Sequence, residues 1–260
     1  MELIVTFKMK ILGEQTVYSK NSSVLMMKIM KLQIAIYTIL LGLLIGCGSK
    51  KEEKVEDKNT AKVESEQSAK KADTKNIIFF GNSLTAGYGV DPSEAFAGLI
   101  QEKIDSLGWK YNVINAGVSG ETTASGLSRV EWVVKRQPVE VFILELGGND
   151  GLRGISPTET NKNLRAIIDK VRTIHPDVEI ILAGMMVPPN MGPDYANEFQ
   201  KLYPAITEDK EVTLIPFLLK DVGGIKELNL PDGIHPTPAG HKIVAETVWE
   251  YLKPKLKTAS

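Results

Sequence analysis

The sequence has 260 residues, which is enough for one large domain or two small ones. Lys and Arg number 31 against 32 Asp and Glu. This balance argues against a nucleic-acid partner, because such proteins need a basic surface to neutralise phosphates. The single cysteine excludes an intramolecular disulfide bond, and with only three histidines we expect no metal site either.

Residues 1–47 are predicted to be an N-terminal extension followed by a secretory signal peptide. Lys28 and Lys31 precede the apolar run LQIAIYTILLGLLIG, and this basic-then-apolar order is typical of signal peptides. The run ends in Leu-Ile-Gly before Cys47, which resembles the lipobox of bacterial lipoproteins, where the cysteine is lipidated and the chain is cut just before it. An uncleaved membrane anchor is the alternative, although the run is shorter than the roughly 20 residues that a span needs.

The lipobox resemblance implies a protein of the bacterial cell envelope. We expect lipid at Cys47 to attach it to the membrane, either at the periplasmic face of the inner membrane or at the outer membrane. Residues 48–75 contain eight lysines and seven acidic residues but no Leu, Ile, Phe, Trp or Tyr. Because such a segment cannot bury enough apolar surface to offset the entropy of ordering it, we expect a charged, flexible linker.

Residues 76–260 are predicted to form one domain. Short apolar runs typical of buried strands occur at NIIFF (76–80), YNVIN (111–115), VEVFILEL (139–146), VEIILAGM (178–185) and VTLIPF (212–217). Apolar residues with helical spacing lie between them, as in 96–107 and 164–174. Strands that alternate with helices predict an α/β fold, a three-layer sandwich whose parallel five-stranded sheet is covered on both faces.

Two helix starts are marked by proline at the first helical position. Ser156-Pro157-Thr158-Glu159 has the pattern of a capping box, and Thr237-Pro238 opens the last helix in the same way. In parallel sheets the functional site lies beyond the carboxyl ends of the strands. The unusual residues of this chain follow the expected strands.

The stretch GNSLTAGYG begins at Gly81, directly after the first expected strand. A serine at such a junction, here Ser83, can present its hydroxyl at the edge of the sheet with backbone N–H groups nearby. A glycine-rich turn, including one that binds phosphate, is the alternative, although neither of the two common nucleotide-binding glycine patterns is matched. The Gly-x-Ser-x-Gly pattern of the α/β-hydrolases is also missing here.

Asp232 stands three residues before His235, in a loop expected just before the last helix. At this spacing the carboxylate can accept a hydrogen bond from one ring nitrogen while the other faces a nucleophile. A surface Asp-Gly turn followed by an incidental histidine is the alternative. We expect His175, at a helix end, and His241, inside the last helix, to be structural or exposed.

Two further loops are rich in small residues. Gly117 lies in the loop expected after the second strand, and Asn149 lies in the GGND stretch after the third. Backbone N–H groups in such loops and the Asn149 amide are the donors that acyl transfer needs where a carbonyl oxygen gains charge. A tight turn would favour the same residue types.

Together the four segments resemble the SGNH (GDSL) hydrolase family, and above all its bacterial thioesterase, arylesterase and lysophospholipase branch. The resemblance covers about residues 76–251. It implies a flavodoxin-like α/β/α fold, with Ser83 as the nucleophile and with Asp232 and His235 as the other members of a catalytic triad.

The resemblance also implies an oxyanion hole made by the N–H groups of Ser83 and Gly117 and by the Asn149 side chain. It implies neither a metal nor an organic cofactor. The chain departs from the family pattern at Asn82, where the first block usually has aspartate. That aspartate is not a triad member, so we expect the change to affect local hydrogen bonding and pH dependence rather than the reaction type.

We therefore expect a monomeric serine ester hydrolase that cleaves small-molecule or lipid acyl esters or thioesters through an acyl-enzyme intermediate. The loop Met185–Tyr195 is rich in Met and Pro, which suits apolar contact with an acyl chain. Two alternatives stay open. A carbohydrate acetylesterase of the same superfamily would have aromatic platforms near the site, and a non-catalytic lipid-anchored binding protein would lack a triad residue.

Overall fold

The computed structural model describes residues 30–31 and 74–256. The chain divides into two units, Met1–Lys58 and Asn59–Ser260, whose relative positions are not determined. No helix within the described ranges is long and apolar enough to cross a bilayer. The predicted signal peptide, the lipid site at Cys47 and nearly all of the linker lie outside the described residues.

A five-stranded sheet forms the centre of the second unit. Its strands are β1 (Lys75–Gly81), β2 (Tyr111–Gly117), β3 (Val141–Glu145), β4 (Glu179–Ala183) and β5 (Thr213–Ile215). All neighbouring pairs are parallel, in the order β2-β1-β3-β4-β5. The predicted parallel sheet is thereby confirmed, and every strand begins and ends within two residues of its expected bounds.

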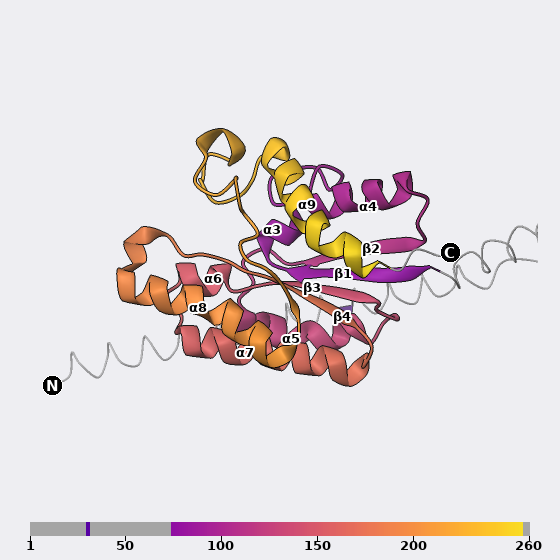
Figure 1. Cartoon of the computed structure of the whole chain (residues 1–260), viewed down its shortest axis with the longest axis horizontal. Coiled ribbons are helices and arrows are strands. Elements are labelled where there is room, and N and C mark those ends of the chain that lie inside the picture. Colours follow the sequence, from indigo (N-terminus) through magenta and orange to yellow (C-terminus); the bar gives the residue numbers. More distant parts are fainter. Residues whose placement is uncertain (1–29, 32–73, 257–260) are drawn as a thin grey trace, which may run out of the picture. The chain divides into compact units, whose positions relative to one another are not determined.

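Helices cover both faces of the sheet (Figure 1). The long helices are α4 (Phe96–Ser106), α5 (Thr123–Val134), α7 (Pro157–Ile174), α8 (Pro193–Lys210) and α9 (Pro238–Leu252). On one face α4 packs against α9, and on the other α5, α7 and α8 lie side by side. Two short helices, α3 (Ser83–Ala86) and α6 (Gly148–Leu152), follow β1 and β3.

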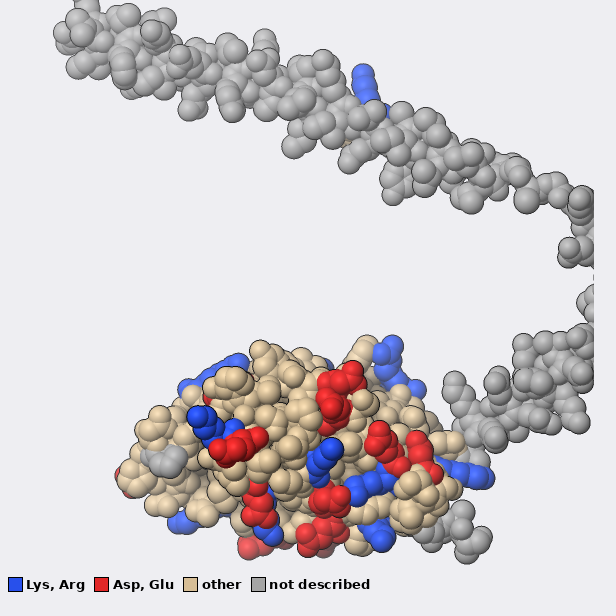
Figure 2. Space-filling view, turned by 90° about the horizontal axis from the view of Figure 1, so that it is seen from above, with Lys and Arg blue, Asp and Glu red and all other residues tan. Residues whose placement is uncertain are grey.

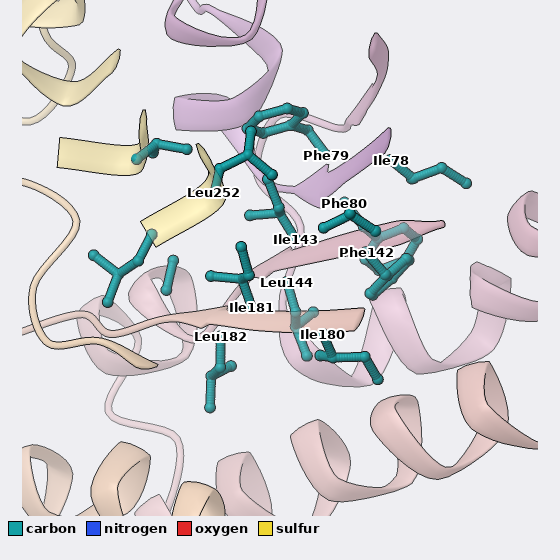
Figure 3. Packing of buried hydrophobic residues seen from close by; sticks show 14 of the residues in the cluster. Ile78, Phe79, Phe80, Phe142, Ile143, Leu144, Ile180, Ile181, Leu182 and Leu252 are labelled. Atoms are coloured by element: carbon teal, nitrogen blue, oxygen red, sulfur yellow. The ribbon is translucent and has the colours of Figure 1, made fainter. Parts of the chain in front are cut away.

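Both faces of β1 are buried, with side chains that alternate between the two helical layers. Phe79 packs against Phe96 of α4 with ring centroids 5.6 Å apart. Phe80 points to the opposite face, where the guanidinium of Arg129 in α5 lies 4.0 Å from its ring centroid. Figure 3 shows buried side chains of β1, β3 and β4 packed between the helical layers. Burial on both sides explains why these strands are continuous apolar runs in the sequence.

Charged side chains of both signs are interspersed over the face seen in Figure 2. Lys103 of α4 and Glu246 of α9 form an ion pair of 2.7 Å between the two helices. Exposed pairs of this kind contribute only about 0–1 kcal/mol. The association of α4 with α9 and with the sheet therefore depends on their buried apolar faces.

Both predicted helix starts are confirmed, but one cap differs from the prediction. Pro157 and Pro238 are the first residues of α7 and α9. The Thr237 side chain accepts a hydrogen bond from the Gly240 N–H, as an N-cap should. Ser156 makes no such side-chain bond, so the predicted capping box is not formed and the preset backbone angle of proline marks this helix start.

Helix α8 was not predicted from the sequence. It begins at Pro193, and Pro189–Met191 form a 3₁₀ turn, so the expected loop Met185–Tyr195 is partly helical. Pro204 inside α8 cannot donate a backbone hydrogen bond and would normally break a helix. The helix is stabilised instead by the side chains that it buries, namely Phe199, Leu202, Tyr203 and Ile206.

Candidate active site

The four segments singled out in the sequence meet at the carboxyl edge of the sheet. Ser83 opens α3 after β1, Gly117 ends β2, Asn149 lies in α6 after β3, and His235 lies in the segment before α9. Parallel strands bring these ends to one edge, as expected. The prediction that all of them lie in loops is wrong, because two lie in short helices and one belongs to a strand.

His235 connects Ser83 and Asp232 through its two ring nitrogens. Its Nε2 lies 2.8 Å from Ser83 Oγ, and its Nδ1 lies 2.7 Å from Asp232 Oδ2. The other carboxylate oxygen accepts hydrogen bonds from the N–H groups of Ile234 and His235, at 2.9 and 3.0 Å. The Tyr88 ring packs beside the imidazole with centroids 4.5 Å apart. Carboxylate and imidazole are therefore held in one orientation.

Asp232 is ionised at neutral pH. Burial alone would raise its pKa, but hydrogen bonds from the His235 ring and from the N–H groups of His235 and Ile234 outweigh burial and lower the pKa to about 2. A carboxylate can only accept hydrogen bonds. In neutral His235 the proton therefore resides on Nδ1, which leaves Nε2 free to accept the proton of the Ser83 hydroxyl.

The turn that contains Ser83 is bound to a buried carboxyl group at the end of β3. Glu145 is only 1% exposed. Its Oε1 accepts a hydrogen bond from Asn82 Nδ2 at 2.7 Å, and its Oε2 accepts from the Asn82 N–H at 3.1 Å and from Thr85 Oγ1 at 2.8 Å. Burial raises the pKa of Glu145 to about 7, although the bonds from Thr85 and Asn82 act in the opposite direction.

Asn82 joins this carboxyl group to the first turn of α3. While its Nδ2 donates to Glu145, its Oδ1 accepts a hydrogen bond from the Leu84 N–H at 2.9 Å and lies 3.5 Å from Ser83 Oγ. The side chain thus acts as the N-cap of α3. Asn82 stands out in the sequence, whereas Glu145 was not predicted, because its only signal is an acidic residue inside an apolar strand.

Asn149 and Gly117, two of the expected oxyanion donors, differ in their freedom to donate. Asn149 Nδ2 donates one hydrogen to the Glu121 carbonyl oxygen at 3.0 Å, and the amide has a second hydrogen to offer. The Gly117 N–H donates to Asn115 Oδ1 at 3.0 Å. The role expected of Gly117 stays a prediction, and it requires that this bond be shared or broken.

Gly120 is a second glycine with a backbone donor at the same turn, and it was not predicted from the sequence. Its φ angle of 79° is in the left-handed region, which favours glycine. Within residues 74–256 its N–H donates to no protein acceptor, whereas its carbonyl oxygen accepts from Arg153 Nη2 at 2.9 Å. Its neighbour Glu121 binds Asn149 through the backbone, so this free N–H lies next to a residue in contact with Asn149.

The backbone before Asn149 can be formed only by glycine. Gly147 has a φ angle of 110°, and a Cβ atom at this position would lie 2.3 Å from the hydroxyl oxygen of Tyr203. That buried hydroxyl donates to the Leu146 carbonyl oxygen at 3.0 Å. Asp150, which is fully buried, accepts a hydrogen bond from the Thr123 N–H at 2.9 Å and so fixes α6 to the start of α5.

A cavity of about 490 Å³ opens beside Ser83 and Asn149. Its wall is mostly apolar, with Leu152, Met185, Met186, Val187, Phe217 and Ile234 among the lining residues. From the expected Met- and Pro-rich loop, residues 185–188 line the cavity. The cavity can therefore bury an elongated apolar group that is attached to a carbonyl carbon at Ser83.

The other two histidines are structural. His241 is 1% exposed, its Nδ1 accepts a hydrogen bond from the Phe96 N–H at 3.2 Å, and burial lowers its pKa to about 4. His175 follows α7 and bonds through Nε2 to the Val134 carbonyl oxygen at 2.8 Å, on the edge of the sheet opposite Ser83. Within residues 30–31 and 74–256 no cluster of His, Cys, Asp and Glu could hold a metal ion.

Comparison with known proteins gives concordant matches. The model of the GDSL-like lipase/acylhydrolase family matches residues 79–243. Esterase TesA of Pseudomonas aeruginosa is 36% identical over 185 residues, which cover 71% of this chain and 91% of TesA. A crystal structure of TesA aligns with a TM-score of 0.67, over 70% of this chain and 100% of that structure.

Two further relatives carry other activities in their names. Thioesterase 1/protease 1/lysophospholipase L1 of Escherichia coli is 34% identical over 183 residues, covering 70% of this chain and 85% of the relative. An arylesterase of Vibrio mimicus is 32% identical over 179 residues, covering 69% of this chain and 88% of the relative. The family match, residues 79–243, includes Ser83, Asp232 and His235.

Proposed function

Because this chain belongs to the GDSL-like lipase/acylhydrolase family and is an ester hydrolase, we propose that it cleaves acyl esters or thioesters with Ser83 as the nucleophile. The 2.8 Å contact of Ser83 Oγ with His235 Nε2, on an imidazole held by ionised Asp232, is the observation that supports this proposal most strongly. It also disfavours the non-catalytic alternative, since all three side chains are in hydrogen-bonding contact.

The proposed reaction has two halves. Ser83 Oγ attacks the acyl carbon while His235 Nε2 takes the hydroxyl proton, and Asp232 stabilises the imidazolium that results. The tetrahedral intermediate expels an alcohol or thiol, which takes the proton from His235. Water, activated by the same nitrogen, then attacks the acyl-serine and releases the acid, so that the enzyme returns to its starting state.

The negative oxygen of the tetrahedral intermediate needs preorganised donors. The Ser83 N–H belongs to the first residue of α3 and has no partner within the helix. The second hydrogen of Asn149 Nδ2 is the side-chain donor. The third comes from the turn after β2, either from Gly117 after release of Asn115 or from Gly120, whose N–H is already free.

The apolar cavity supports an acyl chain rather than a sugar as the group that it binds. Met185, Met186 and Val187 form part of its wall, and unbranched thioether side chains adapt to chains of different shape. Each buried methylene contributes about 0.8 kcal/mol. We therefore propose that specificity rises with acyl length until the cavity is filled.

We further propose that the enzyme acts as a monomer in the bacterial cell envelope, attached by lipid at Cys47. The lipobox-like residues before Cys47 support the anchor. Ser83, His235, Asp232 and Asn149 all belong to one chain, so that the proposed reaction needs no second subunit.

The test is covalent labelling of the full-length protein by a fluorophosphonate, followed by peptide mass spectrometry. Phosphonylation should map to Ser83 and should abolish hydrolysis of p-nitrophenyl esters. Ser83→Ala should be neither labelled nor active. Labelling at another residue, or ester hydrolysis by Ser83→Ala at the wild-type rate, would contradict the proposal.

A further inference from the structure

One ion pair contacts the segments that carry the donors of the proposed oxyanion hole without being part of it. Arg129 of α5 donates from Nε to Glu121 Oε1 at 2.5 Å and from Nη2 to Glu121 Oε2. The Glu121 side chain is 3% exposed and the Arg129 side chain 22% exposed. The Arg129 guanidinium also lies on the face of the Phe80 ring, so that its plane is fixed.

Arg129 holds both ends of the glycine turn after β2. Its Nη2 donates to the Ala116 carbonyl oxygen at 2.8 Å, at the entry to the turn, while its pair with Glu121 fixes the exit. The Ala116 carbonyl and the Gly117 N–H belong to one planar peptide unit, in which the two groups point in opposite directions. Holding the carbonyl therefore sets the direction of the Gly117 N–H. Gly120 lies within the same clamped turn.

Glu121 and Arg129 also make contacts near the other two donors. The Glu121 carbonyl oxygen accepts a hydrogen bond from Asn149 Nδ2 at 3.0 Å. Because the amide group is planar, this bond also fixes the direction of the second N–H of Asn149. Nη2 of Arg129 lies 3.4 Å from the Gly81 carbonyl oxygen, two residues before Ser83. The guanidinium thus contacts Gly81 and the turn 116–121 directly, while Asn149 is connected to it only through the Glu121 backbone.

Stability alone does not explain this pair. Removing two charges from water costs several kcal/mol per ion, and apolar residues of similar volume are often as stabilising as a buried ion pair. An apolar residue could not replace the guanidinium, whose planar set of N–H donors binds backbone oxygens and a carboxylate at the same time. The contacts therefore point to orientation as the contribution of this pair.

We propose that Arg129, paired with Glu121, is a positioning residue that orients the donors of the oxyanion hole; the proposal rests on the function proposed above. Arg129 is not among the residues that line the cavity beside Ser83. Its loss leaves Ser83, His235 and Asp232 in contact but allows the glycine turn and the Asn149 amide to turn away from the negative oxygen. Removal of one oxyanion donor costs about 10²–10³-fold in kcat, so we expect partial misalignment to cost about 10–100-fold.

The test compares Arg129→Lys and Arg129→Gln with the wild type on p-nitrophenyl esters and on an alkyl trifluoromethyl ketone. The ketone is attacked by Ser83 Oγ, its carbonyl oxygen becomes an oxyanion, and the hydroxyl proton passes to His235. We expect kcat to fall about 10–100-fold with KM within about twofold, and ketone affinity to fall in parallel with kcat, because only the tetrahedral species uses the donors.

Arg165→Lys is the matched control. The Arg165 side chain is 26% exposed, pairs with Asp209 and donates to the Ala205 carbonyl oxygen at 2.9 Å, but it connects α7 to α8 away from the site. This variant should change neither kcat nor ketone affinity. Melting temperatures of all variants show whether they are folded.

The proposal is overturned if folded Arg129 variants keep the wild-type kcat, or if their loss is confined to KM. If both fail to fold, Glu121→Gln takes their place, because it weakens the pair while keeping its shape, and we expect a loss of about 3–10-fold in kcat and in ketone affinity. Unchanged values in that variant overturn the proposal as well. Labelling of Ser83 by fluorophosphonate in each variant separates these outcomes from a failure of the proposed function.

Discussion

The amide of Asn82 donates a hydrogen bond of 2.7 Å to the buried carboxyl group of Glu145, directly beside Ser83. An asparagine amide at this position donates its own N–H to the Glu145 carboxylate. An aspartate here could bond to Glu145 only if the two carboxyl groups shared a proton. The residue that departs from the family pattern therefore changes the charge state beneath the proposed nucleophile and leaves His235 and Asp232 untouched.

The first prediction concerns Asn82→Asp. Two carboxyl groups at this distance must share a proton, so the apparent pKa of the pair should rise above that of Glu145 alone. The folded variant then retains a proton that the unfolded chain releases near pH 4, and its stability should fall as the pH rises. We expect activity close to wild type in mild acid and a ratio of variant to wild-type kcat/KM that decreases toward alkaline pH. An inactive wild type together with an active Asn82→Asp variant would contradict this account.

The second prediction concerns the pH dependence of stability. The pKa of Glu145 is raised from 4.5 to about 7. Its contribution to the free energy of unfolding therefore falls as the pH rises between those values. The pKa of His241 is lowered from 6.5 to about 4. Its contribution to the free energy of unfolding therefore falls as the pH decreases over that range. These two trends oppose each other in the wild type.

Glu145→Gln should separate the two trends, because glutamine does not titrate. The variant should lose about 1–3 kcal/mol of stability, because glutamine has one carbonyl oxygen and leaves either the backbone N–H or the side-chain amide of Asn82 without an acceptor. Its melting temperature should then fall steadily as the pH is lowered from 6.5 to 4, as set by the pKa of His241. If the melting temperatures of variant and wild type changed in parallel with pH across this range, Glu145 would not titrate as described.

The strands and the histidine-containing segment were predictable from the sequence because their signals are local. Four consecutive apolar residues in β1 are buried to within 1%, and Pro157 and Pro238 mark helix starts within the sequence itself. The network beneath Ser83 was not predictable, since Asn82 and Glu145 are 63 positions apart. Likewise the bond from the Gly117 N–H to Asn115 depends on one side-chain orientation, which glycine spacing does not indicate.

The third prediction concerns the membrane anchor, which depends only on the sequence before Cys47. Cys47→Ser in the full-length protein should prevent lipid attachment, because serine has no thiol to be modified. We expect the variant to lose incorporation of a labelled fatty acid and to move from the detergent phase to the aqueous phase, or to remain as an uncleaved precursor. Unchanged mass and labelling would rule out Cys47 as the site.

The fourth prediction concerns acyl length. Met186 lines the cavity and is 48% exposed, so its contact with a long chain should contribute about 1 kcal/mol, or roughly fivefold in kcat/KM. Met186→Ser should lower kcat/KM by this factor for long-chain p-nitrophenyl esters and leave the acetate ester unchanged. Leu107→Ser is the matched control, since Leu107 is also 48% exposed but follows α4 outside the cavity. Equal losses on acetate and long-chain esters would place the acyl chain elsewhere.

The last prediction uses non-additivity to test the proposed triad. Because a base is useful only with its nucleophile, Ser83→Ala and His235→Ala should each lower kcat by roughly 10⁴–10⁶-fold, and the double variant should lose little more. Asp232→Asn should cost less, since Ser83 and His235 remain in contact.

Asn149→Ala should cost about 10²–10³-fold, the usual scale for one oxyanion donor, and should leave labelling of Ser83 possible. His175→Ala is the control, because its imidazole bonds to the Val134 carbonyl oxygen at the opposite edge of the sheet. Single and double variants are to be compared by pre-steady-state release of p-nitrophenol, which separates acylation from hydrolysis of the acyl-serine. If the losses from Ser83→Ala and His235→Ala simply multiplied, the two side chains would act independently and the assignment of a triad would be wrong.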